Sequence, residues 1–308
     1  MSGLRIDANF TEDTVGFALE SFLSILSFPT LRFSIEPFSR GRERWLGADA
    51  RLLGEINGFR PFYMQFKRPT AYPDYSSARI VRERKKLGLS VAPRSLFFEL
   101  RAKQPQHATF QHNVLYRLRN RLRSRNLGDA TYVCPLFLDR SAYRFHMHVA
   151  GLRRWLSFRR HYAWDLEDIL VQHGSGVTKF DRIPLLAEHI SIPPHQEVGD
   201  AKHCYSFTEL GGDLSFHSPE ALPEGASSLA AFLNSVAYGF PNGDWKIRPD
   251  RAAEELQLLI GSDSERELFP GALPLLRNDD PISSWMAFGD VLSRTYGIEQ
   301  FVLVNWKD

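Results

Sequence analysis

Apolar residues recur every three or four positions near the start of the chain, the spacing of one buried helix face. They are Val15, Leu19, Phe22, Leu23 and Leu26. Thr11 precedes them as a candidate capping residue, two acids follow it, and Pro29 ends the stretch. The pattern therefore predicts an amphipathic helix that runs from about residue 12 to residue 27.

Three segments with the composition of strands follow this helix. They span residues 31–38, 44–52 and 60–67. Residues 54–58 have turn character around Asn57-Gly58, a pair that favours hairpin turns. If the second and third strands pair as a hairpin, residues 54–58 form its turn.

Apolar and polar side chains alternate in both strands of this hairpin, and successive side chains of a strand point to opposite faces. The apolar faces hold Leu46, Ala48, Ala50 and Leu52 on one strand and Phe62, Met64 and Phe66 on the other. The opposite faces carry Asp49 on one strand, and Gln65 and Lys67 on the other. Pairing would bring these three polar side chains close to one point.

Two helices and a buried strand follow the hairpin. The helices are expected at 77–88 and 110–125, both rich in arginine, and the strand at 130–138 is apolar nearly throughout. The fold class is therefore α/β (α+β). We expect the first half to have the element order αβββαβ around a mixed sheet.

The second half of the chain has a weaker pattern, and we cannot derive its topology. It predicts strands at 186–192, 203–207 and 300–306, and helices at 227–238, 251–260 and 282–295. We expect residues 1–150 to form one domain and residues 151–308 to form a mixed α/β region with an accessory, regulatory or dimerisation role.

The composition is that of a globular protein, with 308 residues, 43% of them hydrophobic and 24% charged. No apolar run reaches the roughly 18 residues that a membrane-spanning helix needs, and the first residues lack the apolar stretch of a secretory signal. Two distant cysteines, Cys134 and Cys204, form neither a disulfide framework nor a zinc pattern. These features predict a cytoplasmic protein with no membrane partner.

Charge is unevenly distributed, although the net charge of the chain is only +2. Residues 1–78 hold nine basic and nine acidic residues. Residues 79–160 hold 19 basic and 4 acidic residues, a net charge of +15, and residues 161–308 hold 10 basic and 23 acidic residues, a net charge of −13. The middle segment favours a polyanionic partner, above all nucleic acid, with pairing to the acidic half as the alternative.

The polar residues of the hairpin suit phosphodiester hydrolysis with Mg²⁺ as the cofactor, or Mn²⁺ in its place. A hard cation prefers oxygen ligands, and Asp49, the Gln65 amide and the backbone carbonyl of Phe66 offer them. Lys67 would orient the attacking water or stabilise the developing charge. Glu20 on the first helix is the expected second carboxylate, and Glu12 is its rival.

The order of elements, with Glu20 on the helix, Gly47-Ala48-Asp49 on one strand and Gln65-Phe66-Lys67 on the next, resembles the PD-(D/E)XK nuclease superfamily. Glutamine in place of the usual acid is similar to the QXK variant of Mrr-type restriction nucleases and antiviral effector nucleases. The resemblance covers about residues 10–140 and implies a restriction-endonuclease-like αβββαβ core with a mixed sheet. It implies a DNA endonuclease in which Glu20, Asp49, Gln65 and Lys67 are catalytic. The resemblance also implies that Glu20, Asp49, Gln65 and the Phe66 carbonyl bind Mg²⁺, and that Gln111 approaches the site.

The two basic helices would hold the phosphate backbone of DNA, with RNA as the other candidate. Their expected contacts are Arg82, Lys85, Lys86, Arg117, Arg121 and Arg125. The alternative function is a catalytically inactive nuclease-fold protein that binds nucleic acid or a protein partner. Double-strand cutting would favour a homodimer. The acidic half would serve a regulatory protein or ligand, or would mask the basic segment.

Two smaller patterns each have a functional and a structural interpretation. Tyr72 and Tyr75 follow the expected lysine site and are either base-stacking residues or ordinary loop tyrosines. His146 and His148 would share one face of a strand, where they bind a metal or serve the fold.

Overall fold

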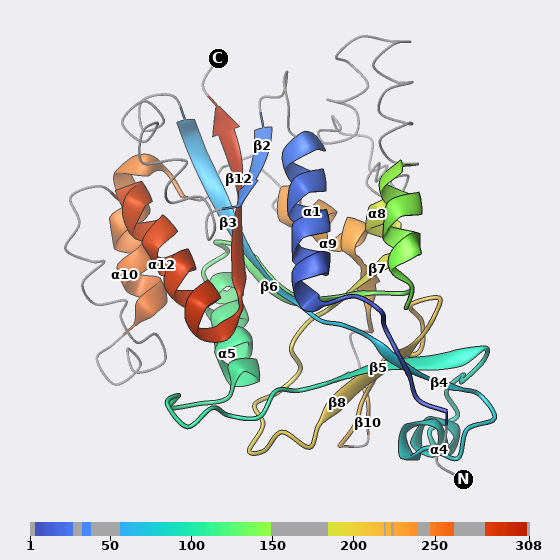
Figure 1. Cartoon of the computed structure of the whole chain (residues 1–308). Helices are drawn as coiled ribbons and strands as arrows, with labels where there is room; N and C mark the ends of the chain where they lie inside the picture. The colour runs from blue at the N-terminus through green and yellow to red at the C-terminus, as the bar shows by residue number, and fades with distance from the viewer. Residues whose placement is uncertain are drawn as a thin grey trace. The chain divides into compact units, whose positions relative to one another are not determined.

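The computed structural model describes residues 4–26, 33–37, 56–148, 184–218, 220–222, 225–238, 247–261 and 281–306 (Figure 1). Its contacts divide the chain into two units, each assembled from separate segments. Unit 1 comprises Met1–Leu19, Phe66–Lys103 and Tyr132–Ser235, and unit 2 comprises Glu20–Gln65, Gln104–Thr131 and Val236–Asp308. The expected domain boundary at residue 150 stays a prediction.

Unit 1 contains a six-stranded antiparallel sheet in the order β1-β4-β5-β8-β9-β10. Its strands are β1 (Ile6–Asp7), β4 (Thr70–Pro73), β5 (Arg94–Glu99), β8 (Cys204–Thr208), β9 (Ser215–Phe216) and β10 (Glu220–Ala221). The strand expected at 203–207 is confirmed as β8. The sequence analysis missed β4 and β5, because short strands next to prolines show too few alternating positions to be recognised.

Helix α4 (Arg79–Lys86) confirms the helix expected at 77–88 and packs on this sheet. Ile80 forms a small buried cluster with Phe97 and Cys204. Beside it, the fully buried Arg84 donates to the Ser206 hydroxyl at 2.8 Å and to the carbonyl of Ser90. The helix is therefore attached to the sheet by both apolar and polar contacts.

The second sheet has the strand order β11-β7-β6-β3-β12-β2. Its strands are β2 (Phe33–Pro37), β3 (Ile56–Phe66), β6 (Asp129–Pro135), β7 (His189–Ile192), β11 (Ser227–Ser228) and β12 (Glu299–Trp306). Strand β12 confirms the terminal strand expected at 300–306 and pairs antiparallel with both β2 and β3. The expected strand 44–52, with Asp49, lies outside the described residues. The mixed α+β class is confirmed, the structure has two sheets rather than the one expected, and the αβββαβ nuclease core stays a prediction.

Strand β3 differs from its expected form. Every residue in it except Asn57 is buried, so neither face is open to solvent. Helix α12 (Pro281–Tyr296) covers the face that was expected to be polar, where the Tyr63 ring meets Phe288 edge-on at 6.4 Å. Asn57-Gly58 lies inside the strand rather than in a turn, because pairing with β12 extends β3 through both residues.

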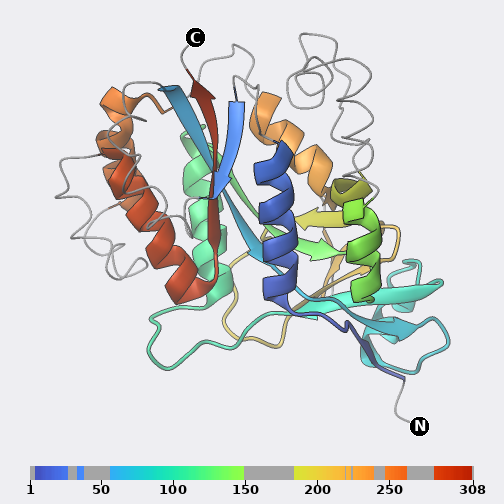
Figure 2. The same ribbon diagram turned by 45° about the horizontal axis from the view of Figure 1, so that its top comes forward.

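The helices of unit 2 confirm three sequence predictions. They are α5 (Gln111–Ser124), α10 (Ala252–Ile260) and α12, and the short 3₁₀ turn Pro249–Arg251 leads into α10. Helices α10 and α12 lie side by side in both views (Figure 1, Figure 2). The Trp285 indole N–H donates to the carbonyl of Ala252 at 2.8 Å and joins the two helices.

The remaining helices include one correction. Helix α1 (Glu12–Leu26) and α9 (Leu229–Tyr238) agree with expectation, and α8 (Pro184–Ala187) is short. Residues 140–148 are helical rather than extended, because the Asp139 carboxylate accepts the N–H of Ser141 and starts a helix there. His146 and His148, two positions apart, therefore do not share a face. Within the described part of the chain, no helix is both long and apolar enough to cross a membrane.

Candidate functional site

Lys67 is a buried cation in unit 1. Only 3% of its side chain is exposed, and its ammonium lies 5.6 Å from the centroid of the Tyr132 ring. Its backbone N–H donates to the carbonyl of Val133 at 2.8 Å, which fixes the start of the side chain. A buried ammonium is costly, so its few partners determine its charge.

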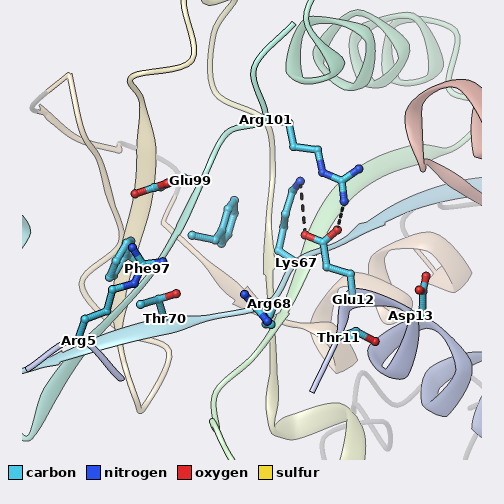
Figure 3. Close-up of a pocket in the computed structure, with 11 residues that line it drawn as sticks. Arg5, Thr11, Glu12, Asp13, Lys67, Arg68, Thr70, Phe97, Glu99 and Arg101 are labelled. Carbon is cyan, nitrogen blue, oxygen red and sulfur yellow. Dashed lines mark hydrogen bonds and ion pairs between the residues drawn. The ribbon is translucent and has the colours of Figure 1, made fainter. Parts of the chain in front are cut away.

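Besides the Tyr132 ring, Lys67 has one carboxylate as a partner, and a second cation contacts the same carboxylate (Figure 3). The Nζ of Lys67 lies 3.9 Å from Oε1 of Glu12, and Arg101 donates to the other carboxylate oxygen of Glu12. Burial lowers the pKa of Lys67 from 10.5 to about 8, with Glu12 opposing the shift and Arg101 adding to it. Lys67 is therefore mostly charged at neutral pH, with its proton held less tightly than that of an exposed lysine.

The start of α1 positions Glu12. Thr11 caps the helix, because its hydroxyl oxygen accepts the N–H of Thr14 at 3.3 Å. Glu12 is the next residue, at the positive end of the helix dipole, and its carboxylate is favoured there. The structure thus places Glu12, the rival candidate, beside Lys67. Glu20 lies eight residues further along the helix, half-buried and in unit 2.

Lys67 and Glu12 line a cavity of about 420 Å³ in unit 1. Four cations and three acids contribute to its wall: Arg5, Lys67, Arg68 and Arg101, with Glu12, Asp13 and Glu99. Figure 3 shows Lys67, Glu12 and Arg101 on one side and Arg5, Thr70, Phe97 and Glu99 on the other. Because two of the cations contact the same carboxylate, an anion entering the cavity would meet charges that are already ordered.

Gln65 lies in unit 2, where its amide is buried. Its Nε2 donates to the carbonyl of Tyr296 at 3.2 Å, and the Gln111 amide donates to the same carbonyl. The Oε1 of Gln65 is buried without a hydrogen-bond partner among the described residues. A buried oxygen without a partner destabilises the fold unless a hydrogen-bond donor or a cation contacts it.

The other expected metal ligands are only partly visible. Asp49 lies outside the described residues, and Phe66 ends β3 with its side chain buried. The described residues contain no group of three or more His, Cys, Asp or Glu side chains that could hold a metal ion. They therefore offer single oxygen donors, such as Gln65 Oε1, rather than a complete ligand set.

The arginines and lysines expected to contact nucleic acid are in different environments. Arg82, Lys85, Lys86 and Arg125 are exposed, although the Lys85 ammonium donates to the carbonyl of Asp74 at 2.9 Å. Arg117 and Arg121 are half-buried. Arg121 donates to the carbonyls of Leu259 and Ile260, each at 2.8 Å, at the end of α10. These bonds give Arg121 a structural role between two helices of unit 2.

Arg101 and Glu99 are site residues that the sequence analysis missed. Both belong to the end of β5 or to the turn after it, and β5 itself was not predicted. Their only sequence signal was charge next to the apolar run of residues 96–98. That signal does not distinguish a cavity wall from an ordinary surface.

No protein-family model, curated protein or solved structure matches this chain. The chemistry of the site is therefore the basis for a functional assignment.

Proposed function

We propose that the chain is a metal-dependent endonuclease that hydrolyses DNA phosphodiester bonds, with restriction or antiphage defence as its setting. The observation that carries the proposal is the buried ammonium of Lys67 on the wall of a polar cavity. Negative charge builds on the phosphate oxygens during hydrolysis, and a fixed ammonium shielded from water stabilises that charge more strongly than an exposed one.

Lys67 has two chemical roles in this proposal. Its ammonium interacts with the phosphate, and its pKa of about 8 allows proton exchange near neutral pH. Glu12 keeps the ammonium in place before substrate arrives. Arg101 holds Glu12 from the other side, so the three groups keep a fixed arrangement.

The proposed cofactor is Mg²⁺ or Mn²⁺, held by oxygen donors. Asp49, Gln65 and Glu20, all in unit 2, are the proposed side-chain ligands. The support from structure is the partnerless Oε1 of Gln65, a neutral oxygen of the kind that hard cations accept. When bound, the ion lowers the pKa of a water molecule and offsets phosphate charge.

DNA is the proposed substrate because basic residues are concentrated near the lysine in sequence. Arg82 and Lys86 on α4 are exposed and suit sequence-independent contacts to phosphates. Arg121 is not needed for this role, since its hydrogen bonds are used within unit 2.

The test is cleavage of an end-labelled DNA duplex in Mg²⁺ by Lys67→Met and by Lys103→Met. Methionine keeps most of the length of lysine and removes the charge. Lys103 is exposed and lies outside the cavity, so its variant is the matched control. We expect at least a hundredfold loss of single-turnover rate for Lys67→Met alone. Equal rates for both variants would overturn the proposal.

A second candidate is nucleic-acid binding without hydrolysis. It is favoured by the pairing of Glu12 with two cations and by the lack of a three-ligand metal group among the described residues. This candidate predicts salt-sensitive DNA binding that Mg²⁺ and Mn²⁺ leave unchanged, with intact DNA after long incubation.

A further inference from the structure

A second cavity of about 410 Å³ lies in unit 1, between α4 and the sheet. Its wall includes Tyr72, Phe97 and Glu99 from the sheet and Arg79 from α4. Lys202 and His203, just before β8, complete the charged part of the wall. Tyr72, Arg79, Lys202 and His203 do not line the Lys67 cavity.

The second cavity adjoins the first. Phe97 and Glu99, near the end of β5, contribute to the walls of both cavities. A nucleic-acid strand that is bound at Lys67 and continues past Phe97 and Glu99 would reach the second cavity. The two cavities together offer sites for neighbouring parts of one nucleic-acid strand.

The aromatic wall of the second cavity is already stacked. The rings of Tyr72 and Phe97 are parallel within 2°, with centroids 5.4 Å apart. Phe97 is only 2% exposed, whereas Tyr72 is half-buried. Tyr72 is thus the ring that a ligand can reach, and a base placed on it would extend an existing stack.

The charged wall suits a phosphate beside that base. Arg79 is largely exposed, with its Nε 3.6 Å from Glu83, and Lys202 adds a second cation. Among the residues that the structure describes, Glu99 is the one acid on this wall, and a carboxylate accepts hydrogen bonds from base amino groups or sugar hydroxyls. The ring can stack on the base of a nucleotide, the two cations can contact its phosphate, and the carboxylate can accept its hydrogen bonds.

We propose that the second cavity is a nucleotide subsite, in which Tyr72 stacks on the base next to the phosphodiester held at Lys67. Arg79 and Lys202 contact the phosphate of that nucleotide. The inference rests on the proposed function for its strand path, but not on hydrolysis. At the position of Tyr72, the protein should bind a strand that carries a base more tightly than a strand that lacks one.

The test uses the wild-type chain in EDTA, which removes the metal needed for cleavage and keeps Lys67, and a set of short, fluorescein-labelled single strands, each with one abasic position. We expect one position at which loss of the base weakens binding about tenfold. The same penalty should vanish when Tyr72→Leu is added and should persist with Tyr72→Phe, which keeps the ring. Tyr75→Leu is the matched control, because Tyr75 is 76% exposed and lines neither cavity.

Each outcome has one meaning. A base penalty that depends on Tyr72 supports the subsite even if the wild-type chain cuts no DNA, in which case only hydrolysis fails. Cleavage by wild type with no position-dependent penalty overturns the subsite and leaves hydrolysis standing. Equal effects of Tyr72→Leu and Tyr75→Leu also overturn it, because stacking at the subsite would be lost in Tyr72→Leu alone. Circular dichroism of each variant verifies the fold.

Discussion

The ammonium of Lys67 has lost most of its water and gained one carboxylate and one aromatic face in return. Because these two contacts do not fully replace the lost hydration, burial lowers the pKa of Lys67 to about 8. The sequence indicated the lysine as a site residue from its strand position, but it gave no sign of burial. Burial depends on Glu12, Tyr132 and Arg101, which come from three distant segments.

The first prediction concerns the pH dependence of anion binding at Lys67. Below its folded pKa the side chain is charged, so affinity for a short oligonucleotide in EDTA should fall several-fold as pH rises from 7 to 9. Lys67→Arg should abolish this fall in affinity, because a guanidinium stays charged from pH 7 to 9. Fluorescence anisotropy measures both. A flat profile for wild type, or the same step in the arginine variant, would contradict the assignment.

A second prediction concerns His189 and stability. Its Nε2 lies 2.9 Å from the Tyr143 hydroxyl and its Nδ1 2.6 Å from the Leu185 carbonyl, and burial lowers its pKa from 6.5 to about 4. The unfolded chain therefore binds more protons between pH 6.5 and 4. This contribution is complete above pH 6.5 and is lost as pH falls towards 4, by up to about 3 kcal/mol.

Urea unfolding between pH 7.5 and 4.5 measures the effect. The free energy of unfolding should fall less with pH in His189→Gln than in wild type. His148→Gln, at an exposed helical position, is the control for replacing a histidine by glutamine. Identical slopes for all three chains would show that His189 does not titrate as stated.

Among the elements, helices with long apolar stripes were predictable, as α1, α5, α10 and α12 show. The terminal strand β12 was also predicted, but not its place beside β3. Strand pairing depends on residues more than two hundred positions apart, and no local pattern records it. The prediction of a turn at Asn57-Gly58 was wrong for the same reason, because pairing with the distant strand β12 extends β3 through these residues.

The close approach of α12 to β12 gives a third prediction. A Cβ on Gly289 would lie 1.9 Å from the amide oxygen of Gln300 and 2.9 Å from its Cβ. Gly289→Ala should therefore destabilise the chain by about 1–3 kcal/mol, although alanine favours helices by about 1 kcal/mol over glycine. Gly199→Ala, where a Cβ meets nothing within 4 Å, should be neutral. Urea unfolding of both variants is the measurement, and equal stabilities would contradict the packing.

Over the whole molecule, the basic segment has fewer available cations than its charge suggests. Arg84 is fully buried, Arg119 and Arg123 pair with Asp129, and Arg121 binds backbone carbonyls. The net charge of residues 79–160 thus predicted a polyanion partner without separating structural arginines from exposed ones. Only the fold distinguishes the two kinds of arginine, because it determines which of them contact acids or backbone carbonyls.

The fourth prediction is the salt dependence of duplex DNA binding. Each phosphate contact contributes about 0.9 to the slope of log affinity against log salt. The Arg82→Ala, Lys86→Ala double variant should lower the slope by roughly 1–2. Lys103→Ala with Arg144→Ala removes two other exposed cations and should change it little. Anisotropy titrations at several salt concentrations would contradict the assignment if both pairs changed the slope equally.

The central claim is metal-dependent hydrolysis of DNA by this chain, and one plasmid assay tests it most directly. Supercoiled plasmid is incubated with wild type, Asp49→Asn or Lys67→Met in Mg²⁺, and with wild type in EDTA. The account predicts nicked or linear plasmid only for wild type in Mg²⁺, while all three proteins still bind DNA. Intact plasmid with wild type in both Mg²⁺ and Mn²⁺, or cleavage that persists in both variants, would contradict it.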